Sequence, residues 1–149
     1  TAAGSGEVRG ATWDEIDLDE RTWTIPASRM KSGKEHRVPL NEAAIGLLRA
    51  LPQEIGNPLV FPGSKKATAM SDMSLTAVLR RMGEGEITVH GFRSTFRDWS
   101  AEQTRYPREA CELSLAHTVG DAVERAYRRG DLFDLRRELM SDWGGFCSP

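Results

Sequence analysis

Hydrophobic and polar residues alternate over two early segments of the chain. The first segment has apolar residues at Ile16, Leu18, Trp23 and Ile25, on either side of the turn residues Asp19-Glu20. A period of two residues is typical of a strand with one buried face. The second segment runs from His36 to Leu40 and follows the glycine-containing turn Lys31-Ser32-Gly33-Lys34. The pattern therefore predicts a hairpin and a third strand, joined into a small antiparallel sheet.

Helical spacing replaces this alternation after residue 40, and one short helix is predicted before the sheet. Ser5 is a candidate cap for the short first helix, which carries Val8 and Ala11, and Asn41 caps a helix that ends before Pro52. A loop with at most one short strand is predicted for 56–66, and a further helix begins at Ser71 or Asp72. The apolar positions of the two later helices are Ile45, Leu48 and Leu51, then Leu75, Val78, Leu79 and Met82.

The C-terminal half contains three more predicted helical segments. Phe92, Phe96 and Trp99 lie at i, i+4 and i+7, the spacing of a buried helical stripe. Pro107 suits the first turn of the next helix, and Gly130 divides the last stretch. The final helix has apolar residues at Leu132, Leu135, Leu139 and Trp143. Strands precede helices, so the predicted fold class is mainly α with a small three-stranded antiparallel β-sheet.

Length and composition favour one globular domain over residues 1–149. Hydrophobic residues make up 39% of the 149 residues and charged residues 28%, which is ordinary for a folded domain. The apolar runs are too short to cross a bilayer, and no segment resembles a secretory signal. We therefore expect a soluble cytoplasmic protein with no membrane partner. Because Thr1 to Ala3 begin in mid-pattern without a methionine, we also expect a further domain upstream.

Charge and cysteine content narrow the chemistry. The net charge of −2 provides no general attraction to nucleic acid, so any contact with DNA must come from local clusters of basic residues. Cys111 and Cys147 lack the closely spaced cysteine or histidine partners of a structural zinc site. The sequence predicts no metal site.

One helix face combines an imidazole with guanidinium groups. His90, Arg93 and Arg97 follow one another at i, i+3 and i+7. A guanidinium binds two phosphate oxygens at once, and an imidazole donates a hydrogen bond or transfers a proton. Taken alone, this spacing is also common on solvated helix faces.

A second group of candidate residues surrounds a tyrosine. His117 precedes Tyr127 by ten residues, and Arg125 and Arg128 flank the tyrosine. A single tyrosine on an amphipathic helix is more often a half-buried core residue than a nucleophile.

The combined motifs resemble the catalytic domain of tyrosine recombinases of the phage integrase family. That family has a helix that opens with His-x-x-Arg, then Leu-(Gly or Ala)-His, then a tyrosine about ten residues on. Here these are His90-Gly91-Phe92-Arg93, Leu115-Ala116-His117 and Tyr127. The early segments Gly6–Gly10 and Trp23–Leu40 resemble the first catalytic block and the β-hairpin of the family. The amino-acid sequence of these motifs is similar to that of prophage integrases of the satellite-phage type.

The resemblance implies a role for each motif residue. Tyr127 attacks a DNA phosphodiester and forms a 3′-phosphotyrosyl bond, which conserves the bond energy, so neither ATP nor a metal cofactor is needed. Arg93 binds the non-bridging oxygens, while His90 and His117 donate hydrogen bonds or carry protons.

The same resemblance assigns two further positions. Lys31, on the hairpin turn, is the general acid that protonates the departing 5′ oxygen, with Lys34 as the weaker candidate. Glu7 matches an acidic position that orients neighbouring groups. Further DNA contacts are expected from four basic residues: Lys34, Arg97, Arg125 and Arg128.

One position departs from the family pattern. An arginine is expected three residues before Glu7, and Gly4 stands there instead. Losing one preorganised donor costs on the order of 10²–10³ in rate. The glycine is compatible with an engineered change, with a naturally degenerate prophage enzyme, or with a misalignment in which Arg9 compensates, although Arg9 lies five residues farther along and projects elsewhere.

Several alternatives to a working recombinase remain open. These are a catalytically impaired remnant that only binds DNA, a type IB topoisomerase-like enzyme, and a purely structural helical domain. The resemblance implies double-stranded DNA attachment sites as partners and a homotetramer on DNA, with nucleoid association when bound. The segment from Leu132 to Trp143 serves either exchange between protomers or ordinary packing within one chain.

Overall fold

The sheet consists of three short antiparallel strands. The computed structural model describes residues 1–65, 68–120 and 130–148. The strands are β1 (Ile16–Asp17), β2 (Thr22–Ile25) and β3 (His36–Pro39), in the order β1-β2-β3. Trp23 of β2 pairs with Ile16 on one side and with Val38 on the other. Between β2 and β3 the chain reverses at Gly33, whose φ of 64° favours glycine. The predicted hairpin and third strand are confirmed.

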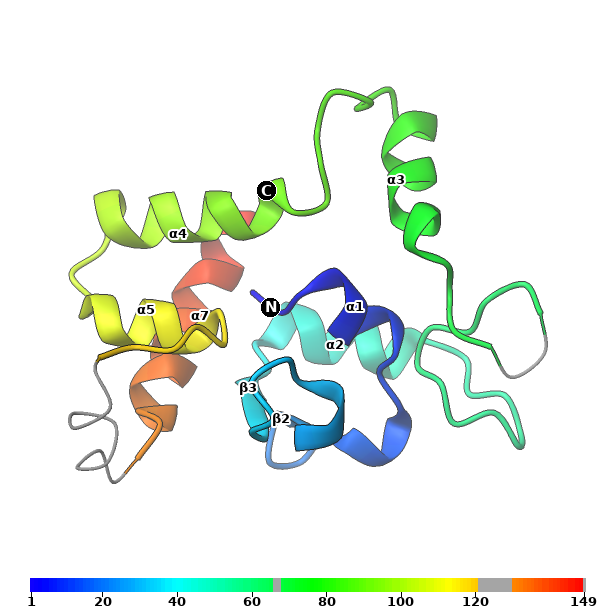
Figure 1. The fold of residues 1–149 in the computed structure, drawn as a ribbon, viewed down its shortest axis with the longest axis horizontal. Coiled ribbons are helices and arrows are strands. Elements are labelled where there is room, and N and C mark those ends of the chain that lie inside the picture. Colours follow the sequence, from blue (N-terminus) through cyan, green and yellow to red (C-terminus); the bar gives the residue numbers. More distant parts are fainter. Residues whose placement is uncertain (66–67, 121–129, 149) are drawn as a thin grey trace.

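Helices make up most of the remaining described chain. They are α1 (Ser5–Arg9), α2 (Glu42–Ala50), α3 (Asp72–Arg81), α4 (Gly91–Gln103), α5 (Arg108–Ser114) and α7 (Phe133–Cys147), with two 3₁₀ helices, η1 (Trp13–Glu15) and η2 (Ala27–Arg29). Figure 1 shows α1, α2 and the sheet in one half of the molecule and α4, α5 and α7 in the other, with α3 at the edge. The predicted class, mainly α with a small sheet, is confirmed. None of the helices in the described residues combines the length and apolar character that a membrane crossing requires.

Helix caps explain where two of these helices begin. Asn41 caps α2 as predicted, because its Oδ1 accepts a 2.9 Å hydrogen bond from the Ala44 amide. Its Nδ2 donates to the Met140 carbonyl oxygen at 2.9 Å, which ties α2 to α7. The predicted Ser5 cap is wrong by one residue. Gly4 is the N-cap, and its amide donates to the Glu7 carboxylate at 2.6 Å, the half of a capping box that needs no side chain on the N-cap residue.

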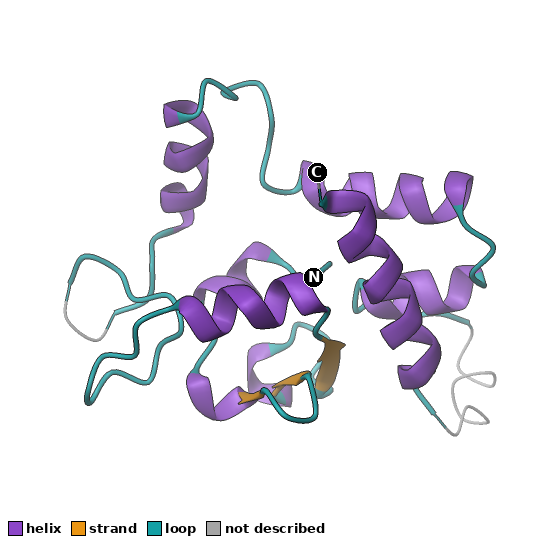
Figure 2. Cartoon of the chain, turned by 180° about the vertical axis from the view of Figure 1, so that it is seen from behind, coloured by secondary structure: helices purple, strands orange, loops and turns teal. Residues whose placement is uncertain are grey.

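Two hydrophobic clusters fill the two halves. The first packs β2 and β3 against α2 and contains Ala11, Trp23, Ile25, Met30, Val38, Leu40, Ile45, Leu48 and Val60. The second joins α4, α5 and α7 and contains Ala2, Phe96, Trp99, Cys111, Leu115, Leu139, Met140 and Trp143. Seen from behind, α7 runs across α4 and α5 (Figure 2). The rings of Phe96 and Trp143 meet edge to face with their centroids 5.4 Å apart, a favourable aromatic geometry.

The predicted aromatic stripe of α4 is only partly correct. Phe96 and Trp99 are buried, whereas Phe92 is 53% exposed. Phe92 lies in the first turn of α4, before the aromatic cluster begins. Helical periodicity predicts which face of a helix is apolar, but it does not predict how far along that face the neighbouring helices extend.

The last helix packs on its own chain through an unusual buried cation. Leu139 and Trp143 of α7 are buried as predicted, but Leu132 precedes the helix and is 37% exposed. Arg136 is 1% exposed and donates to the Arg37 carbonyl oxygen of β3 at 2.6 Å. Burial lowers the pKa of Arg136 to about 10; the Arg37 charge adds to this effect, while Asp131 opposes it. A buried guanidinium thus joins α7 to the sheet.

Candidate active site

Arg93 is anchored between two segments that are distant in sequence. From the first turn of α4 it donates to the Ala2 carbonyl oxygen at 2.7 Å and to the Leu115 carbonyl oxygen at 2.6 Å. Its Nη2 lies 3.5 Å from Nε2 of His117. Backbone carbonyls orient the guanidinium without neutralising it, and within the described residues its remaining N–H groups have no further acceptor.

The charges of Arg93 and Arg97 are balanced differently, although both residues lie on α4. Nε of Arg97 forms an ion pair with Glu112 at 3.2 Å. Among the described residues, no carboxylate forms an ion pair with Arg93. Within this part of the chain the positive charge of Arg93 is therefore not balanced by a carboxylate, which is the property that an anion site requires.

The Leu115-Ala116-His117 segment forms the turn that ends α5. Ala116 has a φ of 57°, a left-handed conformation in which glycine is favoured. The Ala116 amide donates to the Leu113 carbonyl oxygen at 3.1 Å, and the His117 amide donates to that of Glu112 at 3.0 Å. These two bonds form a Schellman motif. The requirement for a positive φ explains why a glycine or a small alanine suits the middle position of this motif.

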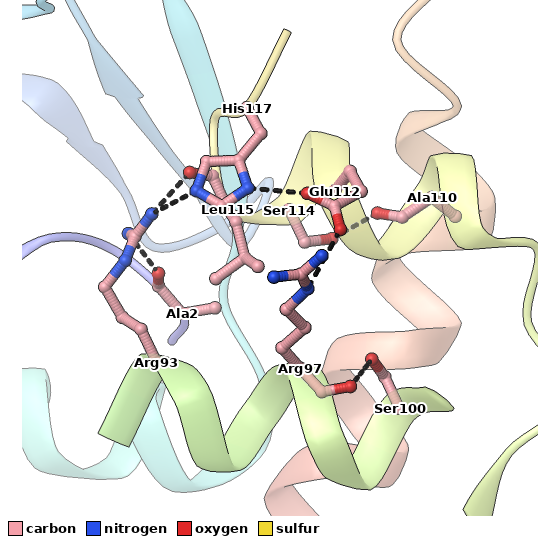
Figure 3. A network of polar contacts seen from close by, with 9 residues as sticks. All are labelled: Ala2, Arg93, Arg97, Ser100, Ala110, Glu112, Ser114, Leu115 and His117. Atoms are coloured by element: carbon pink, nitrogen blue, oxygen red, sulfur yellow. Dashed lines mark hydrogen bonds and ion pairs between the residues drawn. The ribbon is translucent and has the colours of Figure 1, made fainter. Parts of the chain in front are cut away.

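His117 is held by a carboxylate that sequence reasoning missed. Figure 3 shows Glu112 between His117 and Arg97. Oε2 of Glu112 lies 2.6 Å from Nδ1 of His117. Burial tends to raise the pKa of Glu112, but the His117 hydrogen bond and the charges of Arg97, His117 and Arg108 together hold that pKa below its usual value. Glu112 is therefore ionised at neutral pH.

A cavity of about 300 Å³ separates the hairpin turn from the turn after α5. Lys34 and His36 line it from the hairpin side, His117 from the α5 side, and Gly130 and Arg136 from the start of the C-terminal segment. It combines several basic side chains with an opening to solvent.

The two candidate lysines occupy different positions relative to this cavity. Lys34 lines it, whereas Lys31 is exposed on the same turn and is not among its lining residues. The turn is thus present as predicted, and it brings Lys34 rather than Lys31 to the cavity wall.

His36 of β3 has no place in the sequence motifs, yet it lines the same cavity as His117. It is 8% exposed, and its Nε2 is buried without a hydrogen-bond partner in the described residues. Burial, together with the nearby charges of Arg136 and Arg93, lowers the pKa of His36 to about 4, while Asp131 and a hydrogen bond with the Ser114 backbone act in the opposite direction. His36 is therefore neutral at physiological pH.

The side chains of Glu7 and His90 make no hydrogen bond to Arg93 or His117 in the described residues. Glu7 accepts the Gly4 amide, and its backbone carbonyl accepts a hydrogen bond from Arg29, which is itself paired with Glu15. His90 is the exposed N-cap of α4. No hydrogen bond joins the His90 side chain to Arg93 or His117 in the described residues. In these residues, no group of histidine, cysteine and acidic side chains is arranged to hold a metal ion.

Comparison with known proteins places the chain in a family. The model of the phage integrase family matches residues 2–131. The chain belongs to the phage integrase family. The prophage integrase IntA of Escherichia coli K12 is 36% identical over 146 residues, and the integrase of Enterobacteria phage P4 is 36% identical over 164 residues. The integrase of Shigella phage Sf6 is 35% identical over 148 residues.

These alignments cover nearly all of the chain but only part of each relative. They include 96%, 98% and 96% of this integrase-family chain, and 35%, 37% and 38% of the three relatives, respectively. The chain therefore spans little more than a third of the length of the curated relatives that it matches. No solved structure matches it significantly.

The motifs of the phage integrase family are only partly within the described residues. Arg93 and His117 come together, with Glu112 as an added partner. Tyr127, Arg125 and Arg128 lie outside the described residues.

Proposed function

We propose that this chain is the catalytic domain of a tyrosine-type site-specific DNA recombinase. The phenolic oxygen of Tyr127 attacks the phosphorus of a DNA phosphodiester as its proton passes to His117, an O–P bond forms, and the bond to the 5′ oxygen breaks. Lys31 supplies the proton to that oxygen, with Lys34 as the second candidate. Attack by the 5′ hydroxyl of another strand reverses the step and releases Tyr127, so strands are exchanged without an external energy source.

The arrangement of Arg93 and His117 carries this proposal. A cation without a paired carboxylate in the described residues lies 3.5 Å from an imidazole nitrogen. Charge develops on the non-bridging oxygens during phosphoryl transfer, and preorganised donors stabilise that charge. The two groups are suited to bind the same phosphate, with His90 as a further donor.

The choice of nucleophile is supported by the other tyrosine. The chain contains two tyrosines, Tyr106 and Tyr127. The Tyr106 hydroxyl donates to Asp142 at 2.8 Å. Burial and this contact raise the pKa of Tyr106 to about 12, which makes its phenolate hard to form. Tyr127 precedes Gly130, a cavity-lining residue, by three positions, and three residues span at most about 11 Å.

Gly4 lowers the activity that we expect from the chain as it stands. Its φ of −72° and ψ of 152° are accessible to any residue. A Cβ atom at this position would lie 3.2 Å from the Glu7 carboxyl group, so the carboxyl group must shift slightly. An arginine here would begin beside a carboxylate that can orient its guanidinium. Restoring this arginine is therefore feasible for the backbone.

A nicked suicide substrate tests the proposal. In this substrate the short strand diffuses away after cleavage and leaves protein covalently bound to DNA. We expect Gly4→Arg protein to form the adduct without added metal, about 10²–10³ times faster than the parent chain. The matched control is Gly6→Arg, two residues farther along the chain. The absence of any adduct from Gly4→Arg, with DNA binding retained, would contradict the proposal.

A DNA-binding remnant is the second candidate function, and Gly4 is the observation that favours it. Such a protein binds DNA with the salt dependence of phosphate contacts yet forms no adduct after Gly4→Arg. A topoisomerase-like enzyme would instead relax supercoiled DNA without joining two sites. As partners we propose double-stranded attachment sites and, when two sites are paired, a homotetramer in which α7 is a candidate for exchange between protomers.

A further inference from the structure

We propose that Glu112 is a positioning residue for the His117 imidazole: it fixes the ring so that Nδ1 faces inward and Nε2 faces Arg93. The chemical step in which His117 then takes part rests on the proposed function, whereas the orientation of the ring does not. Glu112 has no place in the family motifs described above, and it contacts neither Tyr127 nor the substrate in this proposal.

Two contacts from Glu112 restrain His117. The backbone carbonyl of Glu112 accepts the His117 amide at 3.0 Å, and its carboxylate oxygen Oε2 lies 2.6 Å from Nδ1. The first contact fixes the backbone of the turn, and the second fixes the side chain. With both ends held, the imidazole has little freedom to rotate away from Arg93 (Figure 3).

The chemistry of a carboxylate selects one tautomer of the ring. An ionised carboxylate accepts hydrogen bonds and cannot donate them, so Nδ1 must carry the proton. Nε2 then holds a lone pair when the imidazole is neutral and an N–H when it is protonated. Nε2 lies 3.5 Å from Nη2 of Arg93. In both the neutral and the protonated imidazole, Nε2 therefore faces the proposed phosphate site.

Arg97 holds the carboxylate itself in place. The Glu112 side chain is only 12% exposed, whereas that of His117 is 47% exposed. Its two oxygens are divided, with Oε2 on His117 and Oε1 on Nε of Arg97 at 3.2 Å. A nearly buried carboxylate with two charged or polar partners loses less entropy on orienting the ring than a mobile one would. Arg97 thus acts through Glu112, and Glu112 acts through His117.

The ring state of His117 gives a test that needs no DNA. Two-bond ¹H–¹⁵N correlation spectra of the histidine rings, recorded at a pH where the rings are neutral, distinguish the two tautomers. The chain has three histidines, and His117→Gln assigns the relevant signals. We expect the Nδ1–H tautomer in the parent chain, a change to mainly Nε2–H in Glu112→Ala, and no change in the control Glu102→Ala, which alters an exposed carboxylate on α4. An Nε2–H ring in the parent, or an unchanged ring in Glu112→Ala, would overturn the proposal.

A double-mutant cycle in the Gly4→Arg protein tests the consequence for the reaction. We expect Glu112→Ala to slow adduct formation by about tenfold or more when His117 is present. In His117→Ala protein the same change should have almost no further effect. Glu112→Gln keeps an acceptor oxygen and should recover much of the rate. Equal slowing in both backgrounds would contradict a role through His117.

The two tests separate this inference from the proposed function. If Gly4→Arg forms no adduct but the ring still depends on Glu112, the recombinase proposal fails while the positioning role stands. If the adduct forms normally and the ring is unaffected by Glu112, the positioning role fails alone.

Discussion

The Arg93 guanidinium donates to the Leu115 carbonyl oxygen at 2.6 Å and so joins the first turn of α4 to the turn that follows α5. This contact brings the His-x-x-Arg and Leu-Ala-His motifs together, although they are separated by 22 residues in sequence. Because a backbone carbonyl rather than a carboxylate holds the guanidinium, Arg93 is oriented and keeps its charge.

The difference between Arg93 and Arg97 leads to the first prediction. Arg93→Gln removes an uncompensated charge, so DNA affinity should fall and the slope of log K against log salt should decrease by about 1. Arg97→Gln removes a charge that Glu112 already balances, so its slope should change less. Fluorescence anisotropy over a series of salt concentrations measures both variants. Equal slopes for the two would show that the ion pair does not distinguish them.

The backbone at residue 116 leads to the second prediction. Alanine pays a steric cost at a φ of 57° that glycine does not. We therefore expect Ala116→Gly to raise the free energy of unfolding by about 1 kcal/mol, whereas Ala116→Val should lower it. Urea denaturation provides the measurement, and Ala77→Gly in α3, where φ is helical, should destabilise. If Ala116→Gly destabilises as well, the left-handed turn is not populated in solution.

His36 leads to a prediction of pH dependence. The pKa of His36 in the folded chain is about 4, below the ordinary value of 6.5. The unfolded chain therefore binds the proton first as the pH falls. The free energy of unfolding should decrease from about pH 6.5 down to pH 4, by up to about 1.4 kcal/mol per pH unit.

The contribution of His36 is isolated by comparing variants. His36→Gln should flatten the dependence in this range, even if the variant is less stable overall, whereas His90→Gln, at an exposed position, should leave it unchanged. Urea titrations at several pH values measure the difference. An unaltered slope in His36→Gln would contradict the role of this residue.

The lysines on the hairpin turn lead to the fourth prediction. A substrate with sulfur at the bridging 5′ position has a leaving group that needs no proton. In the Gly4→Arg background, Lys31→Met should slow cleavage of ordinary DNA by about 10²–10⁴. The sulfur substrate should restore the cleavage rate of this variant. Lys34→Met should weaken binding without such restoration. Rescue of Lys34→Met instead would assign the general acid to the lysine that lines the cavity.

Local signals made much of the fold predictable from the sequence. The period-two residues around Trp23, the Gly33 turn and the Asn41 cap each depend on neighbouring residues, and each was confirmed. The predicted burial of Phe92 was wrong because its burial depends on how far the neighbouring helices extend along α4. The buried Arg136 gave no signal, since a charged residue in a helix is ordinarily exposed.

The candidate site was harder to predict because its contacts are long-range or depend on one unusual turn. Arg93 contacts Ala2 across 91 residues, a pairing that no spacing rule indicates. Glu112 lies five residues before His117, a separation that does not share a helix face. Only the left-handed turn at Ala116 brings the imidazole back over that carboxylate.

The central claim is that the phenolic oxygen of Tyr127 forms the bond to DNA. The most direct test is to isolate the covalent adduct from Gly4→Arg protein, digest it, and identify the modified residue by mass spectrometry. We predict a 3′-phosphonucleotide on Tyr127 and no adduct from Tyr127→Phe, while Tyr106→Phe still reacts. A nucleotide attached to any other residue, or an adduct that persists in Tyr127→Phe, would contradict the account.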